Sequence, residues 1–174
     1  MPGTIALVGS GEYLPAMAGL EKSLIDDALA LGKRPTYIQI PTAAGRESQD
    51  RLDYWRALGK VQADKLGVEQ IFLPIYNREG ALNPVFADLI NDSALIYLSG
   101  GDPHHLAQSL RDTPVWESIV KNWHTGSSLA GCSAGASAHA GAFGLYHLGP
   151  FARLAARRRG PPLWRAPADG FGPG

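Results

Sequence analysis

Short apolar segments alternate with segments of helical pattern along this chain, and that alternation is what most constrains its fold. Strands are expected at 4–8, 36–40, 68–73, 94–98 and 128–132. Helical periodicity predicts helices at 15–31, 47–66, 84–90, 103–110 and 114–124. Strands separated by helices pair in parallel through right-handed crossovers. The sequence therefore predicts an α/β fold: a three-layer helix–sheet–helix sandwich around a mainly parallel sheet.

The patterned part of the chain is expected to be one domain over residues 1–150, since 174 residues suit a single domain with a substantial core. Residues 151–174 differ in character. They hold five arginines against one acid, and eight of the 24 residues are Pro or Gly. A basic segment can bind anionic partners, but one so rich in Pro and Gly is more often an irregular tail.

Charge and composition narrow the classes of function. Charged residues make up 18% of the chain and the formal net charge is zero, so nothing favours nucleic acid or an anionic membrane. No apolar run approaches the roughly 20 residues of a membrane span, and no basic segment precedes the N-terminal apolar residues. The single cysteine, Cys132, excludes an intrachain disulfide. We expect a cytoplasmic protein without metal or cofactor, because neither H-E-x-x-H nor a phosphate-binding glycine motif occurs.

Three predicted strand ends carry glycines: 9–11, 100–101 and 131–135. Each segment alone is explained by a tight turn between a strand and a helix. In parallel α/β sheets, however, sites form at the carboxyl ends of the strands. Because the three glycine-bearing strand ends are expected at the same edge of the sheet, together they make a functional site more probable than any one of these segments does alone.

The segment Gly131-Cys132-Ser133-Ala134-Gly135 has the G-x-S-x-G pattern of a nucleophile elbow, a sharp strand-to-helix turn with an exposed serine at its apex. The backbone N–H of Ala134 would then point at a developing oxyanion. Cys132 is interpreted as a small buried residue at the strand end. The competing interpretation is a small-residue turn without chemistry.

Two segments together resemble the aspartyl dipeptidase (peptidase E) and cyanophycinase family of serine peptidases. They are the glycine-pair loop within 97–106 and the nucleophile segment within 130–136; the opening at 5–11 is similar as well. The resemblance covers roughly residues 3–143. It implies a class I glutamine amidotransferase-like fold in which serine replaces the cysteine of those proteins.

By position, the resemblance implies that Ser133 is the nucleophile. It also implies that the N–H of Ala134 and that of Gly100 or Gly101 form the oxyanion hole, where paired glycines allow close approach of the backbone. Asp102 stands where many members have Asn and would orient the substrate. We prefer to interpret Asp102 as the cap of the helix that begins at the following proline.

The family takes its catalytic histidine from a later strand, and no histidine follows His147 in this chain. A natural truncation, an out-of-frame C-terminus, a pseudoenzyme or a substitute histidine would each explain this. His147 is the candidate substitute base, because its glycine-rich segment could fold back. His139 is expected to point away from Ser133. His104 and His105 are interpreted as a solvated helix start, and His124 as a helix-terminal cation.

Three further residues are candidates near the site. Glu12 follows the first strand, where an acid could reach the site, although we prefer to interpret it as a surface loop residue. The dipeptidases of the family select an acidic side chain through basic residues. Arg46 and Arg78 are the loop candidates for that role.

The leading hypothesis is a serine hydrolase that cleaves an amide or peptide bond, weak or inactive in this form because the base is not identified. The substrate would be a small peptide or amide, and a homodimer is left open. A catalytically silent binding or assembly protein on the same scaffold is the alternative. A lipase or esterase of the α/β-hydrolase type fits less well, since that fold needs a longer chain with an acid and a histidine after the serine.

Overall fold

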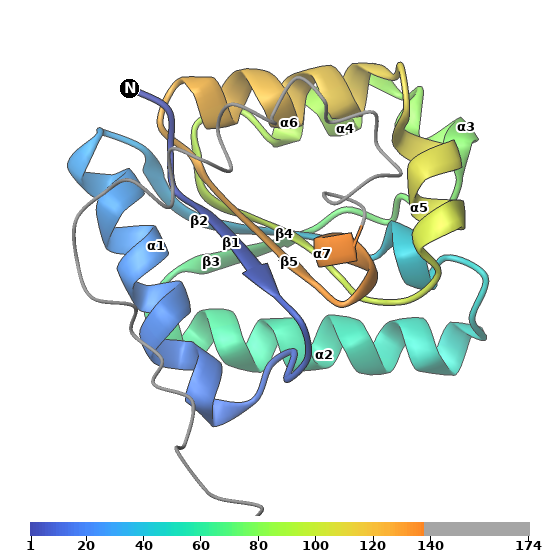
Figure 1. Ribbon diagram of the computed structural model, residues 1–174, viewed down its shortest axis with the longest axis horizontal. Helices are drawn as coiled ribbons and strands as arrows, with labels where there is room; N and C mark the ends of the chain where they lie inside the picture. The colour runs from blue at the N-terminus through green and yellow to red at the C-terminus, as the bar shows by residue number, and fades with distance from the viewer. Residues whose placement is uncertain (138–174) are drawn as a thin grey trace, which may run out of the picture.

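Five parallel strands form one sheet at the centre of the computed structural model, which describes residues 1–137 (Figure 1). The order across the sheet is β1-β5-β4-β2-β3. The strands are β1 Ile5–Val8, β2 Arg34–Ile40, β3 Glu69–Phe72, β4 Ser93–Leu98 and β5 Ser128–Cys132. Every neighbouring pair is parallel, so the predicted pairing is confirmed.

Helices cover both faces of this sheet and complete the predicted three layers (Figure 1). One face carries α1 Ala18–Ala30 and α2 Gln49–Leu66. The other carries α3 Arg78–Ala81, α4 Pro84–Leu89, α5 Pro103–Leu110 and α6 Pro114–His124, while α7 Ala134–Ser137 directly follows β5. Short 3-10 turns at Pro15–Met17 and Thr42–Ala44 complete the list. The tail predicted at 151–174 lies outside the described residues.

The core consists of two apolar layers, because successive side chains of a strand point to opposite faces. Ile38 and Ile96 face the layer of α3 to α6, and Tyr37 and Tyr97 face α1 and α2. All six residues of β4 are buried. A strand covered on both faces has no solvent side, which explains why β4 is apolar from Ala94 to Leu98 rather than alternating.

Three helices begin with the same local chemistry, a capping side chain followed by proline at the first helical position. The caps accept hydrogen bonds from backbone N–H groups one turn in, and proline has no N–H there to leave unpaired. The pairs are Asn83–Pro84, Asp102–Pro103 and Thr113–Pro114. The predicted starts of all three helices are confirmed.

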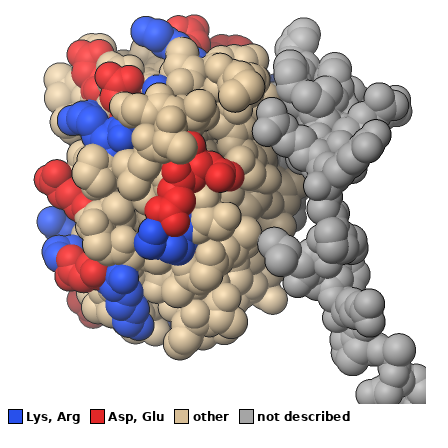
Figure 2. All heavy atoms as spheres, turned by 90° about the vertical axis from the view of Figure 1, so that its left-hand side faces the viewer, with Lys and Arg blue, Asp and Glu red and all other residues tan. Residues whose placement is uncertain are grey.

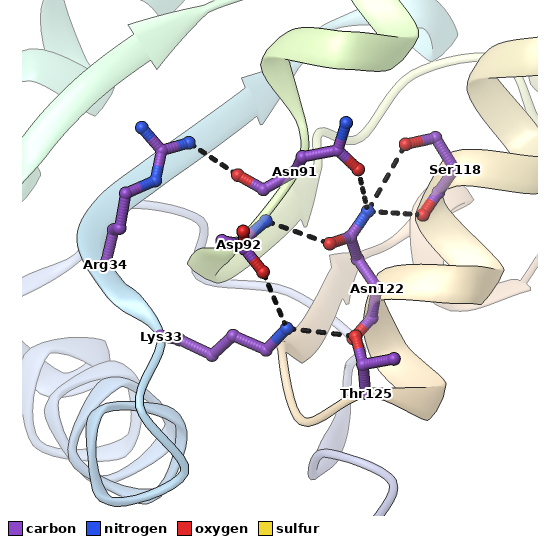
Figure 3. A network of polar contacts seen from close by, with 7 residues as sticks. All are labelled: Lys33, Arg34, Asn91, Asp92, Ser118, Asn122 and Thr125. Atoms are coloured by element: carbon purple, nitrogen blue, oxygen red, sulfur yellow. Dashed lines mark hydrogen bonds and ion pairs between the residues drawn. The ribbon is translucent and has the colours of Figure 1, made fainter.

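The amino ends of β2 and β4 are joined to α6 by a network of polar side chains (Figure 3). Asn122 is buried, and its side-chain amide donates hydrogen bonds to the Ser118 carbonyl at 2.9 Å and to Asn91 Oδ1 at 3.2 Å. Its side-chain oxygen accepts a hydrogen bond from the Asp92 N–H at 2.9 Å. The ammonium of Lys33 donates to Thr125 Oγ1 at 2.9 Å. The polar side chains at the amino end of the sheet are therefore engaged in hydrogen bonds that hold β2, β4 and α6 together.

Charged side chains of both signs are interspersed on the face shown in Figure 2, with uncharged surface between them. In the part of the chain that the structure describes, no helix has both the length and the apolarity needed to cross a membrane.

Candidate active site

Three neighbouring strands bring the glycine-bearing segments to one edge of the sheet. β5 lies between β1 and β4, with Val8 opposite Cys132 and Leu98 opposite Gly131. The chain leaves β4 into the Gly100–Gly101 loop and leaves β5 into Ser133 and α7. The strands ending at Leu98 and Cys132 are neighbours, and the expected shared edge of the glycine-bearing strand ends is confirmed.

Ser133 occupies the junction of β5 and α7 with φ at +48°, in the left-handed region. Its side chain is exposed, and its backbone N–H donates to the Val8 carbonyl at 2.8 Å. The turn admits only small neighbours. A Cβ on Gly131 would lie 2.7 Å from the Gly135 carbonyl carbon, and one on Gly135 would collide with the Leu98 carbonyl oxygen. The G-x-S-x-G pattern is thus explained by backbone packing around a strained serine.

Cys132 is the last residue of β5 and is buried, as predicted. Burial raises the pKa of its thiol, and the negative charge of Glu12 raises that pKa further. A thiolate is the reactive form of cysteine, so this environment disfavours Cys132 as a nucleophile.

The Gly100–Gly101 loop touches the serine turn directly. A Cβ on Gly100 would lie 3.4 Å from Ser133 Cβ and 3.2 Å from Glu12 Oε2. Gly101 has φ at +143°, and a Cβ there would collide with the Ala43 carbonyl oxygen. Gly101 therefore requires glycine, because both space and backbone conformation exclude a side chain, whereas Gly100 leaves only tight space for a Cβ beside Glu12 and Ser133.

Glu12 reaches this site, so the preferred interpretation of it as a surface loop residue is wrong. Its Oε2 accepts a hydrogen bond from the Gly100 N–H at 3.1 Å. Its Oε1 is buried and has no hydrogen-bond partner among the described residues. Burial raises the pKa of the Glu12 carboxyl, and the hydrogen bond from Gly100 opposes that shift. The sequence holds no signal for this contact, because 88 residues separate the two partners.

Asp102 caps α5, which confirms the preferred interpretation. Its Oδ1 accepts from the N–H groups of His104 and His105 at 2.9 and 3.1 Å. The hydrogen bond from His105 is the largest cause that lowers the pKa of this carboxyl. Arg46 Nη1 lies 3.6 Å from Asp102 Oδ2 beside the glycine loop, with the Arg46 side chain largely exposed and that of Asp102 about half exposed.

Arg78, the other basic candidate, donates to the carbonyls of Gln108 and Arg111 at 3.3 and 2.7 Å. Its guanidinium thereby ties α3 to the end of α5. Of the two arginines, Arg46 is the one whose ion pair lies next to Gly101.

The described histidines have separate environments. His104 is exposed, as predicted, but His105 is buried and its Nε2 lies 2.7 Å from the Tyr76 carbonyl oxygen, so the solvated interpretation of His105 is wrong. His124 ends α6 and its ring lies 4.7 Å from that of Trp123. His139 and His147 lie outside the described residues, and the choice of His147 as base stays a prediction. Within residues 1–137, the Ser133 hydroxyl has no hydrogen-bond partner.

The fold and this edge of the sheet define a three-layer α/β protein with an exposed serine on a strand-to-helix turn. The family model of Peptidase family S51 matches residues 5–143. The chain belongs to that family, and the suspected resemblance is confirmed.

Two solved structures are similar to this chain. The crystal structure of a peptidase from an acI-B1 Actinobacterium is 61% identical with a TM-score of 0.76, and the match covers 78% of this chain and 55% of that one. A putative peptidase E protein from Listeria monocytogenes EGD-e is 22% identical with a TM-score of 0.56, covering 78% of this chain and 60% of that one, which supports the fold alone. No curated protein matches the chain. The matched region spans little more than half the length of the actinobacterial peptidase.

Proposed function

We propose that this chain is a serine hydrolase of the peptidase or amidase kind, with Ser133 as the nucleophile. One observation carries the proposal: an exposed serine with φ at +48° stands against a glycine loop from the neighbouring strand. Membership in Peptidase family S51 supports the same chemistry. The proposed substrate is a small peptide or amide.

In the proposed reaction, Ser133 Oγ attacks the amide carbonyl carbon and loses its proton to a base. The carbonyl oxygen becomes an oxyanion, which backbone N–H groups of Ala134 and of the glycine-pair loop stabilise. The tetrahedral intermediate collapses as the C–N bond breaks, and the base returns the proton to the leaving amine. Water then hydrolyses the acyl-enzyme and regenerates the serine.

The proposed activity is weak, because no base is hydrogen-bonded to Ser133 among the described residues. General-base assistance typically contributes about 10²- to 10⁴-fold to such a reaction. His147 remains the proposed substitute base. If no base serves, the scaffold is the catalytically silent binding protein of the alternative hypothesis. The α/β-hydrolase alternative loses support, since the chain belongs to another family.

Arg46 is the proposed contact for an acidic group of the substrate. Its guanidinium lies 3.6 Å from Asp102 Oδ2, and exposed pairs of this kind contribute little free energy. A substrate carboxylate would therefore displace Asp102 from Arg46 at small cost.

Labelling with a fluorophosphonate, followed by mass mapping, tests the proposal. We expect modification at Ser133, no labelling of Ser133→Ala, and unchanged labelling of Cys132→Ser, which removes the neighbouring thiol. Hydrolysis of aspartyl dipeptides and small chromogenic amides, compared between the unchanged chain and His147→Ala, then tests the base. An intact chain that resists the reagent at all concentrations would refute the assignment of Ser133.

A further inference from the structure

The loop from Ser99 to Asp102 has four consecutive backbone N–H groups, and three of them have acceptors. The Ser99 N–H donates to the Ile40 carbonyl at 3.1 Å, and the Asp102 N–H to the Ala43 carbonyl at 2.8 Å. The Gly100 N–H donates to Glu12 Oε2 at 3.1 Å. The N–H of Gly101, an exposed residue, has no acceptor among the described residues. One donor of the loop is thus left for a ligand, and it is the second glycine of the pair.

The two backbone acceptors belong to β2 and the turn that follows it, and β2 is the neighbour of β4 on one side. The third acceptor is a side chain from the segment after β1, which lies on the other side of β4 in the strand order. Glu12 lies in the segment that follows β1, and its neighbour Tyr13 contacts the same loop. The Tyr13 hydroxyl lies 3.2 Å from Ser99 Oγ and accepts from Gln39 Nε2 at 2.6 Å. Tyr13 is buried and has φ at +58°, a conformation that non-glycine residues rarely adopt. The segment after β1 is therefore held in an unusual conformation with two side chains on the glycine loop.

Gly100 is a poor candidate for the oxyanion donor because Glu12 already occupies its N–H. An oxyanion bound there would lie against the carboxyl group, and two negative charges at such a distance repel. Binding at the Gly101 N–H leaves the contact between Glu12 and Gly100 in place. This assignment resolves the choice between the two glycines that the sequence leaves open.

We propose that Glu12 is a positioning residue for the oxyanion hole: it holds the Gly100 N–H, fixes the glycine loop beside Ser133, and leaves the Gly101 N–H to act with that of Ala134. The proposal rests on the proposed function of Ser133 as a nucleophile. Glu12 acts through the loop and does not exchange a proton with the substrate. The geometry agrees with this role, since Glu12 Oε2 accepts from the Gly100 N–H at 3.1 Å while the Gly101 N–H keeps no acceptor among the described residues.

Two measurements on the full chain test the proposal together. Amide hydrogen exchange, followed by NMR, reports on the Gly100 N–H, and the rate of fluorophosphonate labelling reports on Ser133. Glu12→Ala removes the acceptor, so we expect Gly100 to exchange at least about tenfold faster and Ser133 to be labelled about tenfold more slowly. Glu12→Gln retains an acceptor oxygen at the same reach and should stay within about threefold of the unchanged chain in both. Glu69→Ala, an exposed carboxylate on β3, is the matched control.

Three outcomes decide the matter. Unchanged exchange at Gly100 in Glu12→Ala would overturn the proposal. Faster labelling in both Glu12 variants would also overturn it, because Glu12 would then be a competitor for the oxyanion donor. If no form of the chain is labelled, the proposed function of Ser133 fails, while exchange at Gly100 still decides whether Glu12 fixes the loop. If Glu12→Ala does not fold, Glu12→Asp replaces it, since shortening the side chain by one methylene is expected to break the 3.1 Å hydrogen bond to Gly100.

Discussion

Replacing Ser133 by glycine is expected to stabilise the fold while it removes the proposed nucleophile. Ser133 has φ at +48°, and a residue with a Cβ in this left-handed region costs roughly 1–2 kcal/mol. Glycine adopts it freely but loses more conformational entropy on folding, about 0.5–1 kcal/mol relative to alanine. The side chain is exposed and makes no hydrogen bond to described residues, so little else changes.

The comparison that isolates the backbone is Ser133→Gly against Ser133→Ala. Both variants lack the hydroxyl, and only the alanine variant keeps the strained Cβ. We expect Ser133→Gly to be more stable by about 0.5–1 kcal/mol. Urea unfolding at a single pH measures this difference.

Ser10 provides the matched control, because it is also exposed near the same sheet edge but does not have a positive φ. At this position, the free energy of unfolding of Ser10→Gly should be no higher than that of Ser10→Ala. If Ser133→Gly is no more stable than Ser133→Ala, the serine turn is not strained and the argument from its conformation is wrong.

Three further changes have defined outcomes. Gly135→Ala places a Cβ against the Leu98 carbonyl oxygen and should lower the free energy of unfolding by about 1–3 kcal/mol in urea titrations. Asn122→Ala leaves the Asp92 N–H without its buried acceptor and should cost about 1–3 kcal/mol, whereas substitutions at exposed surface positions usually cost under about 0.5 kcal/mol. Burial raises the pKa of Glu21 to about 7, above its unfolded value, so its stabilising contribution is complete below the unfolded pKa and is lost as the pH rises toward 7. Unfolding measured at acidic and neutral pH should show a loss on the order of 3 kcal/mol that Glu21→Gln abolishes, and an equal loss in that variant would contradict the assignment.

Local chemistry explains which parts of the fold the sequence could predict. A cap followed by proline sets the starts of α4, α5 and α6 within a few residues, and glycines with small neighbours set the turn at Ser133. The short helix α3 and the turn at Thr42–Ala44 were not predicted, because elements of three or four residues have no periodicity to detect.

The part of the site that depends on long-range contacts could not be predicted. Glu12 meets Gly100 only because β1, β5 and β4 are adjacent in the sheet. The burial of His105 could not be predicted for the same reason, since its ring contacts the Tyr76 carbonyl, 29 residues away in sequence. The expectation that a side chain at a helix start is solvated is correct for His104, which is exposed.

The strand order also has a consequence for how the protein forms during synthesis. β2, β3 and β4 can pair with one another as soon as they leave the ribosome, but β1, although made first, has only β5 as a neighbour among the described strands. Trp123, just before β5, also donates its indole N–H to the Gly3 carbonyl at 2.8 Å. The N-terminal strand must therefore wait unpaired until residues 128–132 have been translated, and closing so long a loop is slow. Because Glu12 follows β1 and Ser133 follows β5, the last pairing to form among the described strands is the one that assembles the serine site.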